Sequence, residues 1–144
     1  MSQLQENIQA VFAQPRMVAF ATVTSDGKPW VRYVMAAMDA HMNIMFATSL
    51  HSRKVGQLKS NQECHVLAGV TDLASAKNWV QVQGKGEVLT DQKVKDGFWS
   101  PALANYFSGP QDPSYAVIKV TPHRIEYAAM GGAEPEVWRD PSRI

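Results

Sequence analysis

The spacing of apolar residues changes from a helical to a strand-like period after the first fifteen residues. Residues 2–5 have the capping-box pattern Ser-x-x-Gln, which is typical of a helix start. Apolar residues then recur at helical spacing, at Leu4, Ile8, Val11 and Phe12. The pattern predicts an amphipathic helix within residues 1–14, ending before Pro15.

Seven later segments are apolar or alternating and are bounded by turn residues. They predict strands at 17–24, 30–38, 43–48, 63–71, 78–89, 115–121 and 124–129. A turn at 25–29 makes the first two a hairpin, and a tight Pro122–His123 connection joins the last two. Short helices are predicted at 52–60, 91–99 and 101–107, and residues 130–144 predict an irregular tail.

These elements predict a mainly β fold over a single domain, residues 1–144, with flanking helices. The tight connections indicate antiparallel pairing, and closure into a barrel removes the exposed edges of such a sheet. Strands and helices do not alternate, which argues against a doubly wound parallel sheet. Gly84-Lys85-Gly86 has no third glycine and lies within a strand pattern, so we reject it as a dinucleotide fingerprint.

Composition narrows the classes of function. The 144 residues are 45% hydrophobic and 19% charged, as in a globular domain, and the net charge of +1 gives no bulk attraction to nucleic acid or membranes. The single cysteine, Cys64, rules out an internal disulfide and is read as a small buried residue. The four histidines form no metal-type pair. Without a signal-peptide pattern or a membrane-length apolar run, we expect a cytoplasmic protein.

The segment Ile44–Leu58 carries the clearest candidate chemistry. An apolar strand pattern leads through hydroxyl residues to Ser52-Arg53-Lys54 at the predicted start of a helix. A helix N-terminus with adjacent cations can hold a phosphate, but an ordinary capped surface helix explains the same residues. Arg32 interrupts a strand pattern, and on its own it is read as an edge or solvent-facing residue rather than an anion ligand.

Several segments in this order resemble the FMN-binding split barrels of the pyridoxamine 5′-phosphate oxidase group. The first are Arg32–Met38, Phe46-Ala47-Thr48 and Ser52-Arg53-Lys54. The later ones are Gly84-Lys85-Gly86-Glu87, Tyr106-Phe107 through Asp112-Pro113, Val120-Thr121-Pro122 and Ile125-Glu126-Tyr127. The resemblance covers nearly the whole chain, and the later segments look most like the general stress protein 26 branch.

The resemblance implies a six-stranded antiparallel split barrel that forms a homodimer with two FMN molecules at the subunit interface. It assigns the FMN phosphate and ribityl chain to Arg32, Thr48, Ser52, Arg53 and Lys54. It places the backbone around Val34, Met35 and Ala47 against the isoalloxazine ring, with Trp79 and Gln81 reaching the flavin of the partner. For Trp30, Trp99 and Trp138, core or dimer packing is the expected role.

Departures from the family pattern remove the substrate half of the site. The lysine that contacts the substrate phosphate in the oxidase is replaced by Ala37, and no arginine–histidine motif follows Gly131-Gly132. Ala128 stands where an aromatic residue is common. We therefore expect that the protein is not a pyridoxamine phosphate oxidase, and we assign no catalytic residue. Three hypotheses remain: an FMN oxidoreductase with a reduced nicotinamide donor, a non-enzymatic FMN-binding protein, or a split barrel that has lost FMN or binds haem or deazaflavin.

Overall fold

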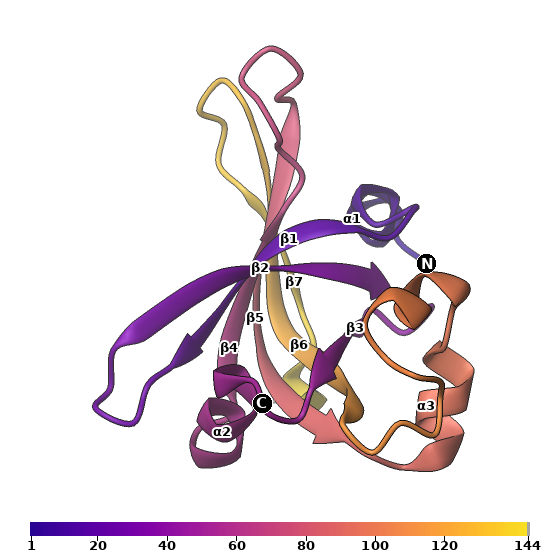
Figure 1. Cartoon of the computed structure of the whole chain (residues 1–144). Helices are drawn as coiled ribbons and strands as arrows, with labels where there is room; N and C mark the ends of the chain where they lie inside the picture. The colour runs from indigo at the N-terminus through magenta and orange to yellow at the C-terminus, as the bar shows by residue number, and fades with distance from the viewer. Residues whose placement is uncertain (144) are drawn as a thin grey trace.

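The computed structural model describes residues 1–143, and its strands form one antiparallel sheet (Figure 1). The strands are β1 (Arg16–Val23), β2 (Pro29–Met38), β3 (Ile44–Ser49), β4 (Glu63–Ala68), β5 (Asn78–Leu89), β6 (Tyr115–Ala129) and β7 (Glu136–Arg139). The helices are α1 (Gln3–Val11), α2 (Arg53–Ser60) and α3 (Gln92–Phe98), with 3₁₀ turns η1 (Pro101–Asn105) and η2 (Pro141–Arg143). The sheet order is β3-β2-β1-β4-β5-β6-β7, and β3 also pairs with β6. Six strands therefore close into the predicted antiparallel barrel.

The barrel core follows from the two-residue period of its strands. Alternate side chains of each strand point inward, and the inward set is mainly apolar, with Thr22, Arg32 and Thr48 as polar members. Phe20 and Phe46 meet inside with ring centroids 4.8 Å apart in an edge-to-face arrangement. Helix α1 starts at the predicted capping box, and its Ile8 joins the same core.

The C-terminal strands differ from the prediction of two strands joined by a tight turn. β6 continues through Pro122 and His123 without a turn. Gln83 pairs with Arg124 and Gly84 pairs with Pro122, so His123 is the extra residue of a β-bulge. Because proline cannot donate a ladder hydrogen bond, a bulge is where a long strand can accommodate it.

Two other boundaries differ from the sequence prediction. β7 lies within the predicted irregular tail and pairs with β6, with Arg139 opposite Arg124. Its four residues are too few to show a period, which is why the pattern missed it. β4 ends at Ala68 rather than at residue 71, just before Gly69, whose φ is +125°. The tail prediction also includes residue 144, which lies outside the described residues.

Helix α2 is fixed against the barrel by two buried residues, Val55 and Leu58. A Cβ atom added at Gly86 would lie 2.9 Å from Leu58 Cδ2 and would displace this side chain of α2, and one added at Gly84 would lie 2.8 Å from the backbone oxygen of Thr121 on β6. The Gly-Lys-Gly sequence therefore has a packing role, in agreement with its rejection as a dinucleotide motif. Within residues 1–143, no helix combines the length and apolarity needed to cross a membrane.

Candidate functional site

The barrel is split between β2 and β3. Only Ala37↔Met45 and Met38↔Ile44 are paired between these strands, and the two strands diverge from there (Figure 1). Val34 and Met35 on β2 and Ala47 on β3 lie beyond the last β2–β3 ladder pair, and β1 and β6 pair with these strands on their other sides. Such strand edges can offer backbone donors and acceptors to a planar group.

Helix α2 begins at the end of β3, beside this split. Ser52 is its N-cap residue, but the Ser52 side chain caps no helical N–H. The Ser52 hydroxyl instead lies 3.0 Å from the hydroxyl of Thr48, which is 4% exposed. The first turn contains no acidic residue, so its positive dipole end has no local counter-charge. The site therefore combines helix N–H groups with two hydroxyls.

Arg32 points toward the inside of the barrel rather than outward at a sheet edge. Its Nη1 donates to Thr22 Oγ1 at 2.8 Å, and its Nη2 donates to Gln57 Oε1 at 2.9 Å. Its guanidinium carbon also lies 5.8 Å from the centre of the Phe20 ring. The interpretation of Arg32 as an edge or solvent-facing residue is wrong, because it shares the inward face of β2 with buried Val34.

Three positive charges gather where β2 meets α2, and we call Arg32, Arg53 and Lys54 the cation cluster. Burial, followed by the charge of Arg53, lowers the pKa of Arg32. Burial and then the charge of Arg32 lower the pKa of Lys54. Among residues 1–143, no ion pair involves a member of this cluster. Like charges held together without carboxylates form a receptor for an anion.

The exposed guanidinium of Arg53 is held by an aromatic ring rather than by a carboxylate. Its carbon Cζ lies 5.4 Å from the centre of the Trp30 ring, a cation–π contact. Trp30 is 46% exposed, so of the two expected roles, core or dimer packing, the core of this chain is excluded and the dimer stays a prediction. A stacked guanidinium keeps its N–H edge available, and this edge can bind two oxygens of one phosphate.

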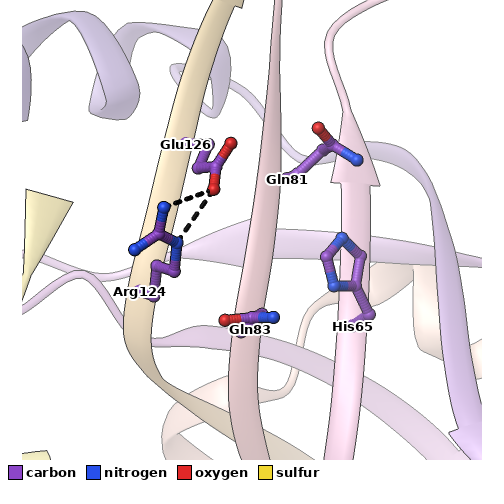
Figure 2. A pocket seen from close by; sticks show the side chains of 5 residues that line it. All are labelled: His65, Gln81, Gln83, Arg124 and Glu126. Atoms are coloured by element: carbon purple, nitrogen blue, oxygen red, sulfur yellow. Dashed lines mark hydrogen bonds and ion pairs between the residues drawn. The ribbon is translucent and has the colours of Figure 1, made fainter. Parts of the chain in front are cut away.

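Trp79 and Gln81 lie elsewhere, on the outward face of β5. Figure 2 shows the side chain of Gln81 beside that of His65, and Gln81 lines an open pocket of about 170 Å³ on β4, β5 and β6. We call its lining the outward pocket: His65, Gln81, Gln83, Arg124 and Glu126. Here Arg124 Nη2 lies 2.7 Å from Glu126 Oε2, so this arginine is already paired. Within one chain the structure does not bring Trp79 or Gln81 into the cation cluster.

The outward face of β1 and β2 carries exposed apolar side chains, and this apolar area extends to Leu67 on β4. Tyr33 is 76% exposed there, and it stands opposite Ala19, which in turn stands opposite Leu67. Met17 and Met35 are directly opposite each other on the same face, and both are exposed. An exposed apolar area of this kind marks an interaction surface.

The structure brings Arg32, Arg53 and Lys54 together and places the hydroxyls of Thr48 and Ser52 side by side. It also adds three residues to the site that were not predicted from the sequence. These are Thr22, Trp30 and Gln57. A polar residue at an inward strand position was a signal for Thr22, because it shares its face with Val18 and Phe20. Gln57 follows Arg53 by one helical turn, but the sequence cannot show which strand that helix face meets.

Residues 1–143 offer neither a metal site nor a reactive thiol. Residues 1–143 hold no group of three His, Cys, Asp or Glu side chains that could bind a metal ion. Cys64 is buried, as predicted, and burial followed by the charge of Glu63 raises its thiol pKa to about 12. A thiol that stays protonated is a poor nucleophile, in agreement with its reading as a core residue.

Fold and site together define a split-barrel protein with an anion site where β2, β3 and α2 meet. The family model described as pyridoxamine 5′-phosphate oxidase matches residues 4–129, and the chain belongs to this family. General stress protein 26 of Bacillus subtilis is 26% identical over 132 residues, or 92% of this chain and 93% of that protein. The crystal structure of general stress protein 26 from Bacillus anthracis is 28% identical, with a TM-score of 0.81, and the match covers 96% of this chain and 99% of that one. The predicted resemblance is confirmed.

More distant structures share the fold but differ in what their names say they bind. A pyridoxamine 5′-phosphate oxidase-related, FMN binding protein from Nostoc punctiforme has a TM-score of 0.75 at 13% identity, covering 100% of this chain and 95% of its own. A heme binding protein from Mycobacterium smegmatis has a TM-score of 0.77 at 14% identity, covering 96% of this chain and 59% of its own. At these identities the two likenesses show the shared fold alone.

Proposed function

We propose that this chain is an FMN-binding protein and that it acts as a flavin-dependent oxidoreductase. The observation that carries the FMN assignment is the cation cluster without carboxylate partners beside an uncapped helix N-terminus. A phosphate monoester carries up to two negative charges and takes several donors at once. This set of donors suits its oxygens.

The residues present fit the phosphate and the polar chain of FMN. Arg32, Arg53 and Lys54 would bind the phosphate, with the hydroxyls of Thr48 and Ser52 beside it. The unpaired strand edges at Val34, Met35 and Ala47 would bind the flavin ring. When bound, FMN supplies electron transfer, and the chain's own role is to hold and orient it. Haem is held instead through an axial His, Met, Cys or Tyr ligand, and none of Arg32, Arg53 and Lys54 can supply one.

The proposal includes a homodimer. The apolar outward face around Tyr33 is the surface that a second copy would cover, and Trp79 and Gln81 stand on the same side of the sheet. In the dimer these two residues would reach the FMN held mainly by the other subunit. Such a contribution to the site of the other subunit would explain why Trp79 and Gln81 lie outside the cation cluster of their own chain.

Pyridoxamine phosphate is not part of the proposal. Ala37 leaves no cation at the position where the oxidase family has its substrate-binding lysine, and Val137 and Trp138 occupy β7 after Gly131-Gly132. A second phosphate-bearing ligand would have no charged partner at these positions. We infer a different substrate, with a reduced nicotinamide as the electron donor.

The test is a visible spectrum of the purified protein, followed by an FMN titration and light scattering. We expect flavin absorbance, one FMN per chain at saturation, and the mass of a dimer. A Soret band in place of flavin absorbance would assign haem, and failure to bind added FMN would remove the FMN assignment. Anaerobic NADH or NADPH then tests the activity. Rapid bleaching with turnover on reoxidation supports the oxidoreductase, and a flavin inert to both donors makes the protein a non-enzymatic FMN binder.

A further inference from the structure

Gln57 connects α2 to β2 and β1 beside the anion site. It lies on α2, one helical turn after Arg53, and its Oε1 accepts a hydrogen bond from Arg32 Nη2 on β2 at 2.9 Å. The same oxygen accepts a hydrogen bond from the hydroxyl of Thr22 on β1. Thr22 in turn accepts one from Arg32 Nη1, so Arg32, Thr22 and Gln57 form a closed triangle.

We propose that Gln57 is a positioning residue that holds Arg32 for phosphate binding. The inference rests on the proposed FMN function and deepens it by naming how the strand cation and the helix cations are kept together. Gln57 touches the guanidinium and would act on the phosphate through it.

The hydrogen bonds fix the orientation of the Gln57 amide. Arg32 has only donors, so the amide oxygen must face it, because the flipped amide would place NH₂ against the guanidinium. The Gln57 Nε2 group donates no hydrogen bond within residues 1–143 and stays available. Arg32 Nη1 also donates to the carbonyl oxygen of Phe20 at 3.4 Å, so Arg32 keeps its Nε–H and one N–H of Nη2 for a ligand.

A neutral amide is the side chain that this position requires. A carboxylate of the same length would also accept from Arg32 and Thr22, but it would neutralise the charge that attracts the phosphate. An apolar side chain would preserve the charge and lose the orientation. Helix α2 does not depend on Gln57 for its docking, because Val55 and Leu58 bury its apolar side. A substitution at Gln57 can therefore test the positioning of Arg32 without preventing α2 from docking.

The experiment compares FMN with riboflavin, which has the same ring and no phosphate. Dissociation constants are measured by flavin fluorescence for the full-length wild type, Gln57→Leu, Gln57→Glu and the exposed control Gln62→Leu. We expect Gln57→Leu to weaken FMN binding about 2- to 12-fold, the equivalent of one hydrogen bond, and to leave riboflavin binding unchanged. Gln57→Glu should weaken FMN binding by roughly tenfold or more, again without affecting riboflavin. Gln62→Leu should change neither constant.

Inorganic phosphate provides a flavin-independent reading through the shift of the melting temperature it produces. The wild type should show a shift that shrinks in Gln57→Leu and disappears in Gln57→Glu. An unchanged ratio of FMN to riboflavin affinity in both variants, with or without a lower melting temperature, would overturn the positioning role. If the wild type responds to phosphate but not to FMN, the proposed function fails while the phosphate shifts still decide the role of Gln57. A wild type that responds to neither ligand overturns both proposals.

Discussion

The cation cluster and the outward pocket each contain a strand arginine with a glutamine beside it. Arg32 faces inward and Arg124 faces outward, and the two arginines have opposite kinds of charged neighbour. Arg32 donates to neutral oxygens and lies near two further cations. Arg124 donates to the carboxylate of Glu126 through both Nε and Nη2, at 2.8 and 2.7 Å (Figure 2). One arginine keeps its charge available, whereas the other has its charge neutralised within the chain.

The pKa shifts of neighbouring groups show the same contrast. Burial is the largest cause at both places, lowering the pKa of Lys54 and of His65. The second cause differs in sign: the charge of Arg32 lowers the pKa of Lys54 further, whereas the charge of Glu126 raises that of His65. The cation cluster therefore disfavours its own positive charge until an anion arrives. An anion site is therefore identified by the group with which its arginine is paired, more than by the presence of the arginine.

The strongest test of this comparison removes one arginine from each region. Arg53→Ala should weaken FMN binding roughly 10- to 150-fold, because a charge-assisted contact to phosphate contributes about 1.5–3 kcal/mol. Arg124→Gln should leave FMN affinity within about twofold, since Glu126 already satisfies that charge. Flavin fluorescence gives both dissociation constants, and circular dichroism checks that each variant is folded.

Two outcomes would contradict the expected difference between Arg53→Ala and Arg124→Gln. Unchanged FMN affinity in folded Arg53→Ala would remove the cation cluster as the phosphate site. An equal loss in both variants would show that the ion pair with Glu126 does not neutralise Arg124 for ligand binding. The contrast between the two regions would then have no functional meaning.

A smaller effect is expected from the aromatic support of Arg53. Trp30→Leu removes the ring that lies 5.4 Å from the guanidinium carbon. An exposed cation–π contact is worth about 0.5–1 kcal/mol, so FMN affinity should fall about two- to fivefold. Trp30→Phe keeps a ring and should recover most of the loss. Equal affinities for all three proteins would show that stacking does not prepare Arg53 for the phosphate.

Much of the barrel could be predicted because its signals are local. The capping box placed the start of α1, and the two-residue period with turn residues placed β1 to β5. The bulge at His123 and the four-residue strand β7 could not be predicted, because both depend on pairing with a partner strand. The β3–β6 pairing that closes the barrel joins segments about 70 residues apart, and no local pattern specifies it.

The candidate site divides in the same way. Ser52-Arg53-Lys54 is visible in the sequence because hydroxyl and cations coincide with a helix start. The inward direction of Arg32 was present in the strand parity, since Val34 and Ala36 share its face, but a charge at that position favoured the edge reading. The triangle of Arg32, Thr22 and Gln57 depends on how α2 docks on β1 and β2, which is a tertiary property.

The environment of His65 in the outward pocket should make the stability of the protein depend on pH. Its pKa in the folded protein lies below the ordinary value of 6.5, because burial outweighs the opposing charge of Glu126. As the pH falls below about 6.5, the unfolded chain therefore takes up a proton before the folded chain does, and the free energy of unfolding decreases. The contribution of His65 to the free energy of unfolding is fully present above that pH and is lost as the pH falls through the folded pKa.

Urea midpoints measured between about pH 7.5 and pH 5 should therefore fall for the wild type, and the fall should be smaller in His65→Gln. Glu126→Gln removes the charge that raises the pKa and leaves Arg124 unpaired beside it, so it should steepen the fall. If Glu126→Gln instead flattened the curve, the carboxylate would not be the group that balances this pocket, and the contrast with the acid-free cation cluster would lose its physical basis.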